Sequence, residues 1–349
     1  MKVLIVKTSA LGDIVHAMPV VSYLHDVDAS LQIDWLVEKR FAPLLESQRQ
    51  IHSVHRIDTK LWRRPDHISK AFLEIRNVIW LLRREKYDVI LDLQGNSKSG
   101  LFAFLAGAPL RYGFDKHSVR EYPNLLASNR KVTIPGMVRH ISDRALKMAS
   151  CAFPGGTIKT GSTTLTVEGK IYREVENSLR QEGLKHRRLL LVHAGTTWKT
   201  KQMSYEFWKR LITELNRNEQ LYLLFSWGSQ EELAFARRLK QEVPERSLVW
   251  PKAPLTELMA LSAQVDVVIG GDTGPVHIAA AIGTPTVSFY RATDRRRNGP
   301  RGRKHLTFQA AMECSPCLLK TCPQDQRCSN SINPDEAVRA VYKQLDLDL

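Results

Sequence analysis

Residues 265–290 have the sequence Val-Asp-Val-Val-Ile-Gly-Gly-Asp-Thr-Gly-Pro-Val-His-Ile-Ala-Ala-Ala-Ile-Gly-Thr-Pro-Thr-Val-Ser-Phe-Tyr, and this stretch decides the fold. The β-branched run over 265–269 predicts a strand. The small apolar residues over 276–282, followed by Gly283, predict a helix. A second strand is expected over 286–290. Strand, turn, helix and strand in this order predict a parallel β-α-β unit.

The turn of this unit is suited to a phosphate group. Pro275 fits the first helical position, so Thr273 or Gly274 would cap the helix and leave free backbone N–H groups directed into the turn. The alternative is that Asp272 merely caps a helix, because α/β proteins contain many turns of this kind. The pattern by itself leaves both interpretations open.

The N-terminus repeats the design. Residues 2–7 predict a strand, residues 8–13 a turn, and the apolar spacing over 14–25 a helix. Both units place an aspartate beside a glycine. We therefore expect two α/β domains that face each other, with the functional site in the cleft between them.

The rest of the chain alternates short apolar runs with amphipathic segments, which predicts parallel sheets covered by helices on both faces. The further strands are expected over 33–37, 54–57, 89–93, 111–114, 188–193, 221–226 and 248–250. The further helices are expected over 69–84, 97–106, 140–152, 170–182, 205–216, 230–242, 255–263 and 334–347.

A segment rich in Gly, Ser and Thr over 153–165 is the best linker candidate. We predict an N-terminal domain over 1–160, a C-terminal domain over 166–332 and a final helical segment over 333–349. The length of 349 residues fits two domains of about 150 residues each. The apolar stretches are shorter than the ~20 residues of a membrane span, and the N-terminus has no secretory signal pattern, so a cytoplasmic location is expected.

The net charge of +15 implies an anionic partner. Much of the excess lies in three clusters, at 60–64, 111–130 and 291–304; the last holds seven basic residues and one acid. The partner could be nucleic acid, an acidic membrane face or a phosphorylated substrate. We expect no nucleic acid, because the sequence contains no recognisable nucleic-acid-binding module.

The motifs of several enzyme classes are missing. No G-x-G-x-x-G follows the first strand, and no G-x-x-x-x-G-K-[ST] or H-E-x-x-H occurs, which argues against dinucleotide redox chemistry, P-loop phosphoryl transfer and zinc proteolysis. Two phosphate-suited helix starts without these motifs favour a nucleotide-sugar transferase. The rival from another class is a non-catalytic binder of nucleic acid or membrane that uses the basic patches and a cysteine knuckle.

Four motifs in chain order resemble those of the ADP-heptose:lipopolysaccharide heptosyltransferases of glycosyltransferase family 9. They are residues 7–13 with Pro19, 92–95 with Lys98, 193–197 with Lys201, and 272–277. Residues 118–123 and 129–131 are similar to heptosyltransferase I within the family. The resemblance reaches both halves of the chain. It implies a GT-B fold, with the acceptor on the first Rossmann-like domain, the nucleotide sugar on the second, and a last helix that crosses back to the first.

The resemblance also implies an activity. It is inverting transfer of L-glycero-D-manno-heptose from ADP-heptose to the Kdo region of a lipid A precursor, at the inner face of the cytoplasmic membrane and with no metal required. Asp13 matches the catalytic aspartate and would take the proton of the acceptor hydroxyl. Lys201 would stabilise the leaving ADP. Within the enzyme class, the rivals are a heptosyltransferase II-like enzyme and a protein-directed heptosyltransferase.

The remaining candidates divide into donor and acceptor residues. Cations are expected on the acceptor side, because Kdo carries carboxylates and lipid A carries phosphates. The bland alternatives are a helix cap for Asp13, a packing role for His277, a helix-start acid at Glu231 and solvated loops for the cations. The donor candidates are Thr196, Thr197, Lys199, Lys201, Glu231, Asp272, Thr273, Gly274 and His277; the acceptor candidates are Arg63, Arg64, Gln94, Lys98 and Arg120.

The segment 314–328 holds four of the five cysteines, Cys314, Cys317, Cys322 and Cys328. Their spacing is compatible with a tetrahedral thiolate metal site. In a reducing cytosol, free thiols or a metal knuckle are favoured over disulfides. A metal here would be structural, and the segment could instead shape a binding loop or an oligomer contact.

Overall fold

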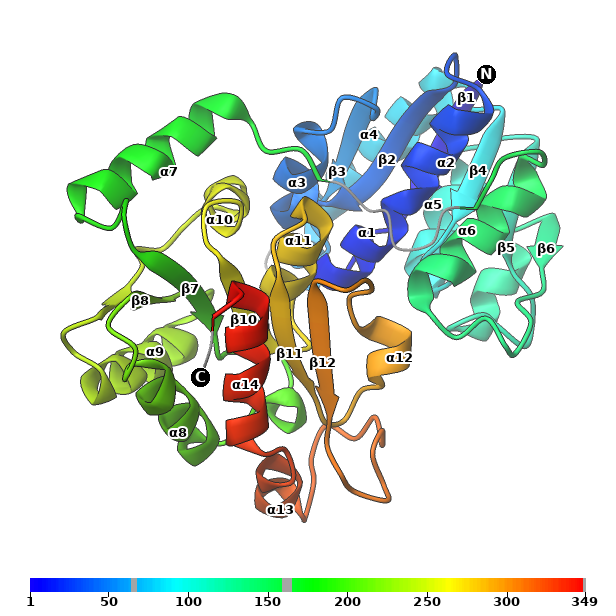
Figure 1. The fold of residues 1–349 in the computed structure, drawn as a ribbon. Coiled ribbons are helices and arrows are strands. Elements are labelled where there is room, and N and C mark those ends of the chain that lie inside the picture. Colours follow the sequence, from blue (N-terminus) through cyan, green and yellow to red (C-terminus); the bar gives the residue numbers. More distant parts are fainter. Residues whose placement is uncertain (64–67, 159–164, 348–349) are drawn as a thin grey trace. The chain divides into compact units, whose positions relative to one another are not determined.

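Two parallel sheets form the framework of the protein (Figure 1). The computed structural model describes residues 1–63, 68–158 and 165–347. The chain divides into two units, Met1–Ser162 and Thr163–Leu349. This division falls within the predicted linker, of which residues 159–164 lie outside the described part of the chain.

The first unit contains the strand order β3-β2-β1-β4-β5-β6, and all its neighbouring strands are parallel. Its strands are β1 (Lys2–Val6), β2 (Gln32–Glu38), β3 (Ser53–Ile57), β4 (Val89–Asp92), β5 (Leu110–Phe114) and β6 (Arg130–Val132). Its helices are α1 (Leu11–Ala17), α2 (Pro19–Val27), α3 (Ala42–Glu46), α4 (Ile68–Glu85), α5 (Ser97–Leu105) and α6 (Ile141–Ala152), and its short 3-10 helices include η1 (Lys39–Phe41), η2 (Leu61–Arg63) and η4 (Tyr122–Leu126).

Alternation along β1 explains how this sheet is covered on both faces. Leu4 and Val6 belong to one buried cluster together with Leu82 of α4 and Phe102 of α5. The alternate residues of β1 point to the opposite face, because successive side chains of a strand point to opposite sides. Helices α1 and α2 both contact α6, as expected for helices that share that second face.

The second unit contains the strand order β12-β11-β10-β7-β8-β9, again fully parallel. Its strands are β7 (Arg188–His193), β8 (Leu221–Phe225), β9 (Ser247–Val249), β10 (Val267–Gly271), β11 (Thr286–Tyr290) and β12 (His305–Gln309). Its helices are α7 (Gly169–Gln181), α8 (Tyr205–Leu215), α9 (Gln230–Glu242), α10 (Leu255–Ser262), α11 (Gly274–Ile282), α12 (Arg295–Asn298), α13 (Asp325–Asn330) and α14 (Pro334–Leu345), with the 3-10 helix η5 (Lys199–Lys201).

The two faces of this second sheet form separate cores. Leu190 and Val192 of β7 pack with buried residues of α8, α9 and α14, whereas Leu189 and Leu191 pack with those of α7, α10 and α11. This alternation fixes the register of the central strand, since a slip by one residue would exchange the two faces.

Helix α14 packs within the second unit. It contacts α8, β10 and β11, and Val338, Val341 and Tyr342 are buried in the core that contains Trp208. The apolar face of α14 is therefore buried in the core of the second unit. The crossing of this helix to the first unit stays a prediction.

The prediction missed the short helices α3, α12 and α13, and further details of the predicted fold are wrong. The helix expected over 14–25 is two helices, because Pro19 lacks a backbone N–H group and begins α2 after Met18. Helix α1 starts at Leu11, so Asp13 lies in its first turn instead of in the preceding loop. The strands β6 and β12 were not predicted; both lie at sheet edges, and their sequences, Arg-Lys-Val and His-Leu-Thr-Phe-Gln, are largely polar.

None of the helices in the described residues combines the length and the apolar composition needed to cross a bilayer.

Candidate functional site

In the first unit, the residues after β1 and β4 meet at the carboxyl edge of the sheet, where parallel α/β sheets bind their ligands. The ammonium group of buried Lys7 donates a hydrogen bond to the carbonyl oxygen of Leu93 (3.1 Å) and lies 3.8 Å from the Asp13 carboxylate. The Asp13 side chain is 32% exposed. A carboxylate is thus held at this edge and remains accessible to a substrate.

Gln94 joins the two loops. Its side-chain oxygen accepts hydrogen bonds from the backbone N–H groups of Thr8 (3.1 Å) and Ser9 (3.2 Å), just before α1. The Gln94 side chain is buried, and its Nε2 atom has no hydrogen-bond partner within the described residues. The structure shows that Gln94 fixes the loop that carries Asp13, while its predicted contact with the acceptor stays a prediction.

The buried Asp92 side chain holds this loop in place through hydrogen bonds. Its buried carboxylate accepts hydrogen bonds from Asn124 Nδ2 (2.6 Å), Ser99 Oγ (2.9 Å) and the backbone N–H groups of Gln94 and Gly95 (3.0 and 3.1 Å). Burial raises the pKa of Asp92, and these hydrogen bonds partly oppose the increase. The motif of residues 92–95 therefore contains a buried hydrogen-bond network that supports the loop after β4.

Of the predicted acceptor cations, Lys98 and Arg120 lie close to this hydrogen-bond network. Lys98 is the second residue of α5, directly after the network, and is partly buried. The backbone N–H group of Arg120 donates to the Gly95 carbonyl (3.1 Å), while the side chain of Arg120 is exposed. Arg63 ends η2, and Arg64 lies outside the described residues. The backbone of Arg120 thus lies beside the segment 94–98, which contains Gln94 and Lys98.

In the second unit, the central feature is an ion pair between Lys201 and Asp272. Their side chains come from the loops after β7 and β10, the Nζ–Oδ2 distance is 2.7 Å, and the side chains are only 16% and 4% exposed. The other oxygen of Asp272 lies 3.0 Å from Nε2 of buried His277, one helical turn into α11. Asn298 Nδ2 donates to Asp272 Oδ2 over 3.3 Å.

The electrostatics of Asp272 follow from these contacts. Burial acts to raise its pKa, but the hydrogen bond from His277 and the charge of Lys201 outweigh burial, so the pKa of Asp272 lies well below its usual value. Asp272 is therefore an anion that holds Lys201 and His277 in place. The packing role considered for His277 is present, together with a polar contact to the candidate site.

The start of α11 follows the prediction, except that Gly274 is the first helical residue and Pro275 the second. Thr273 is the N-cap residue with an extended backbone, no side-chain cap bond is made, and Pro275 lies in the first turn. Gly283 ends the helix in the left-handed conformation, with φ of +100°. A Cβ atom on Gly270 would lie 2.7 Å from the Val276 side chain, so only glycine lets the strand approach the helix this closely.

The loop after β7 contributes the other donor candidates. Thr196 lies against Gly271 and donates from its hydroxyl to the carbonyl of Trp198 (2.7 Å). Thr197 and Lys199 are exposed. The Lys201 ammonium lies 4.9 Å from the centre of the Trp198 ring. The loop thus presents Thr196 and Lys201 beside β10, with Thr197 and Lys199 directed to solvent.

The acid that contacts this loop from α9 is Glu232, whereas the predicted Glu231 is exposed. Glu232 accepts hydrogen bonds from the backbone of Gly228 (2.6 Å) and Ser229 (3.2 Å), and its carboxyl group lies directly against Gly195. The pattern Ser-x-x-Glu over 229–232 is a capping box and could have identified this residue.

The cysteine segment 314–328, for which free thiols, a binding loop and a structural metal were all considered, lies in the same unit. Cys328 is buried in α13, and Cys314 is exposed. In the described ranges, no three His, Cys, Asp or Glu side chains are placed to hold a metal ion. Burial raises the pKa of the Cys328 thiol, and the buried guanidinium of Arg291, which binds Asp325 at 2.7 Å, opposes this increase. The Arg291 guanidinium thus lies beside the buried Cys328 thiol, and a structural metal on this segment stays a prediction.

The segment has a structural role that the hydrogen bonds show. The Thr200 hydroxyl donates to the carbonyl of Leu319 (2.6 Å), which ties it to η5 beside Lys201. The Lys320 ammonium lies 5.5 Å from the Trp198 ring. Residues 314–328 therefore support the loop that carries Lys201, as one of the alternatives for this segment proposed.

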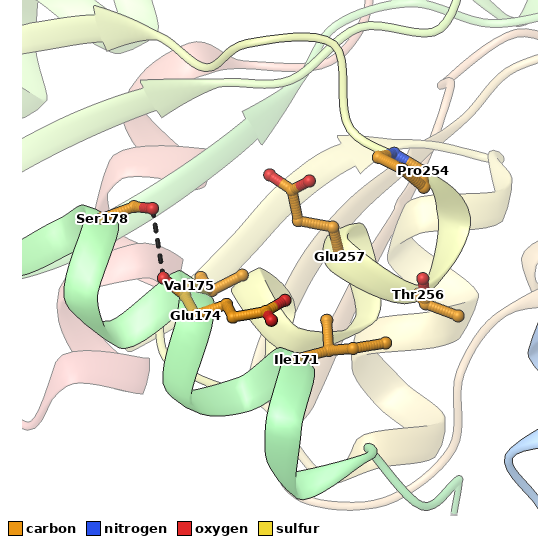
Figure 2. Close-up of a pocket in the computed structure, with 7 residues that line it drawn as sticks. All are labelled: Ile171, Glu174, Val175, Ser178, Pro254, Thr256 and Glu257. Atoms are coloured by element: carbon orange, nitrogen blue, oxygen red, sulfur yellow. Dashed lines mark hydrogen bonds between the residues drawn. The ribbon is translucent and has the colours of Figure 1, made fainter.

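A hollow of about 240 Å³ lies elsewhere in the second unit, between α7 and α10 (Figure 2). Glu257, which accepts a hydrogen bond from Trp250 Nε1 (3.1 Å), and Glu174 place two acids in its wall. An anionic diphosphate would be repelled there. The hollow is lined by Ile171, Glu174, Val175, Ser178, Pro254, Thr256 and Glu257, none of which is a predicted site residue.

A comparison with protein families identifies the class of protein. The family described as glycosyltransferase family 9 (heptosyltransferase) matches residues 75–327, which is more than half of the chain. The chain belongs to glycosyltransferase family 9. The family predicted from the four motifs is confirmed, and with it the assignment of the protein as a glycosyltransferase.

Individual relatives agree with this membership. Lipopolysaccharide heptosyltransferase 1 of Pseudomonas aeruginosa is 28% identical over 327 residues, which cover 92% of this chain and 87% of that protein. The predicted similarity to heptosyltransferase I is confirmed by this relative.

Solved structures confirm the fold class. E. coli heptosyltransferase WaaC with ADP is 23% identical and has a TM-score of 0.80, covering 99% of this chain and 100% of WaaC. WaaC with ADP-2-deoxy-2-fluoro heptose has a TM-score of 0.77 at the same identity and coverage. The two Rossmann-like parallel sheets predicted for a GT-B protein are therefore confirmed.

Proposed function

We propose that this chain transfers L-glycero-D-manno-heptose from ADP-heptose to the Kdo region of a lipid A precursor in lipopolysaccharide inner-core synthesis. Membership in family 9 and the similarity to lipopolysaccharide heptosyltransferase 1 support this activity. The WaaC structures with ADP and with a fluorinated ADP-heptose support the donor. The reaction would take place at the cytoplasmic side of the membrane that carries the acceptor.

The observation that carries the proposal is the set of side chains at the carboxyl ends of the strands in each of the two sheets. One edge holds the accessible carboxylate of Asp13, and the other holds the Lys201–Asp272 pair beside the start of α11. A base and an anion-binding group are the two functions that an inverting glycosyl transfer needs.

In the proposed step, the oxygen of an acceptor hydroxyl bonds to the anomeric carbon of the heptose. The bond from that carbon to the diphosphate oxygen breaks, and ADP leaves with the electron pair. The hydroxyl proton passes to the Asp13 carboxylate. Lys7 and Gln94 position this carboxylate by holding the loop before α1. The anomeric configuration is inverted, because attack and departure occur on opposite sides of the carbon.

The charge that develops on ADP would be stabilised in the second unit. Lys201 has three N–H donors, of which one binds Asp272, so two can reach the diphosphate. The backbone N–H groups of Thr273 and Gly274, at the start of α11, provide further donors to an anion. With these groups in place, the proposed reaction requires no metal ion.

Asp272 would contribute through hydroxyl groups of the donor and not through its phosphates, since two anions repel each other. Its buried position and its contact with His277 orient it for this role. Thr196, Thr197, Lys199 and Glu231 remain proposed donor contacts. Lys98, Arg120, Arg63 and Arg64 remain proposed contacts for the carboxylates and phosphates of the acceptor.

The experiment that tests this function is a matrix of donors and acceptors with the purified chain. ADP-heptose and ADP-glucose are each combined with Kdo-lipid A, with heptosylated Kdo-lipid A and with a protein acceptor, and transfer is followed by mass spectrometry. We expect transfer only from ADP-heptose to Kdo-lipid A. A preference for the heptosylated acceptor would favour a heptosyltransferase II-like activity, and a preference for protein would favour the protein-directed one.

The rival from another class, a non-catalytic binder of nucleic acid or membrane, is tested in the same preparations. It predicts salt-sensitive DNA or lipid binding, no thermal shift with ADP and no transfer in any combination. The membership of the chain in a glycosyltransferase family argues against it.

A further inference from the structure

Helix α4 of the first unit exposes large apolar side chains. Phe72 is 66% exposed, Leu73 46%, Trp80 60% and Leu81 37%. The opposite side of the same helix is already buried, with Val78 and Leu82 in the core of the sheet. The fold therefore gives no reason for apolar residues on the outer side, where an amphipathic helix usually carries polar ones.

The charged residues on this outer side are basic. Lys70, Arg76, Arg83 and Arg84 are exposed at helical spacing among the apolar residues, and Arg84 lies 5.4 Å from the centre of the Trp80 ring. Between residues 69 and 85 the helix has two acids, and both are bonded within the unit. Glu74 accepts from Trp62 Nε1 (3.1 Å) and from the backbone of Asp58 (2.8 Å), and Glu85 pairs with Lys2 (2.9 Å).

Helix α5 extends the same surface. Phe102 of α5 and Leu82 of α4 are buried in one cluster, so both helices cover the same face of the sheet and their outer sides point away from it. Arg83 Nε donates to the Leu105 carbonyl (2.8 Å) and joins the two helices. Leu101 and Phe104 of α5 are 50% and 53% exposed. We use the name α4–α5 face for the outer residues of these two helices, which are Lys70, Phe72, Leu73, Arg76, Trp80, Leu81, Arg83, Arg84, Leu101 and Phe104.

We propose that the α4–α5 face docks on the surface of an anionic lipid bilayer. Aromatic and leucine side chains would enter the boundary between headgroups and acyl chains, and the basic side chains would contact lipid phosphates. The net charge of +15 adds attraction to an anionic surface.

The chemistry of the face distinguishes this partner from two others. A second copy of the chain would bring four basic residues against four more, which is repulsive. A nucleic acid would use the basic and aromatic residues, but it offers no apolar environment for Leu73, Leu81 and Leu101.

The biological role of this docking rests on the proposed function, because it would bring the edge with Asp13 to an acceptor anchored in the membrane. Helix α5 begins directly after the Asp92–Asn96 segment at that edge, so the face and the proposed acceptor side are adjacent in the fold. Lipid binding itself can be measured without donor or acceptor.

The test is co-sedimentation of the full chain with vesicles of phosphatidylcholine alone and of phosphatidylcholine mixed with phosphatidylglycerol. The variant is Trp80→Ser combined with Arg76→Glu. The matched control is Tyr172→Ser combined with Arg173→Glu, an exposed aromatic and a neighbouring exposed arginine on α7. We expect the unaltered chain and the control to bind the anionic vesicles equally, and the α4 variant to bind at least tenfold more weakly.

Two further readouts separate this proposal from the proposed function. Transfer to acceptor dispersed in detergent should be the same in all three proteins, and transfer to acceptor in anionic vesicles should fall only in the α4 variant. Equal vesicle binding by the α4 variant and the control, or no binding by the unaltered chain, would overturn the docking. Gel filtration showing a dimer that only the α4 variant dissociates would also overturn it, in favour of an interface between copies. Vesicle binding without any transfer would overturn the proposed function and leave the docking in place.

Discussion

The buried ion pair between Lys201 and Asp272 gives the most specific energetic prediction. Two unit charges 2.7 Å apart interact by about 6 kcal/mol at an effective dielectric constant near 20, and desolvation cancels part of this. Removing one member leaves the other charge buried without its partner. We expect Lys201→Met and Asp272→Asn each to lower the stability of the second unit by about 3–5 kcal/mol.

The double variant should cost less than the sum of the two single variants. In a double-mutant cycle we expect a coupling energy of about 2–3 kcal/mol, because neither charge is then left alone. Native-state hydrogen exchange of the β10 and α11 amides measures the second unit by itself, so unfolding of the first unit does not interfere. The single variants should also bind ADP more weakly.

An exposed pair provides the matched control. Arg210 and Asp335 are 2.6 Å apart, but their side chains are 58% and 41% exposed. Their coupling should stay within about 0.5 kcal/mol, because solvent screens exposed pairs. A coupling energy for Lys201 and Asp272 as small as that of the control would refute the argument that burial strengthens the interaction between these two charges.

Three further predictions concern the two units separately. Asp92→Asn replaces a carboxylate that accepts four hydrogen bonds, and its amide N–H group would face the donors Asn124 and Ser99, so the first unit should lose about 2–4 kcal/mol in urea denaturation; an unchanged midpoint would contradict the network. Burial, with the nearby charge of Lys304, lowers the pKa of His305 to about 4. Between about pH 6.5 and 4 the unfolded chain therefore binds a proton that the folded chain does not, so stability should fall by roughly 2 kcal/mol from about pH 7.5 to about pH 5, and His305→Gln should abolish this slope. Glu232→Ala should cost about 1 kcal/mol through loss of the cap of α9, whereas Glu231→Ala should stay within about 0.5 kcal/mol of the unaltered chain; equal effects in chemical denaturation would show that the capping box is not the cause.

The sequence was sufficient for the parts of the fold that depend on local pattern. Interior strands such as β7 and β11 are short, almost fully buried and rich in apolar or β-branched residues, and their bounds were predicted correctly. The edge strands β3 and β9 were predicted, whereas the edge strands β6 and β12 were missed because their residues are largely polar. The break at Met18 was missed because apolar spacing continues across Pro19, although the proline itself marks it.

The polar partners of the site could not be predicted, because they are distant in sequence. Asn124 reaches Asp92 across 32 positions, Asn298 reaches Asp272 across 26, and Thr200 binds the carbonyl of Leu319 across 119. The motifs identified Lys201 and Asp272 as donor candidates but not their pairing. The contact of Glu232 with the loop after β7 was not predicted, and it shows a different limit, since a shift of one residue in a helix turns the side chain by about 100°.

The central claim is that the Asp13 carboxylate takes the proton of the acceptor hydroxyl. The most direct measurement is the single-turnover rate of heptose transfer from ADP-heptose to Kdo-lipid A by Asp13→Asn. Asp88→Asn is the control, because Asp88 is exposed and precedes β4 at the opposite edge of the same sheet. We predict a rate reduced by about 10²–10⁴-fold in Asp13→Asn alone, with an unchanged thermal shift on ADP binding. A transfer rate equal to that of the control would contradict the account.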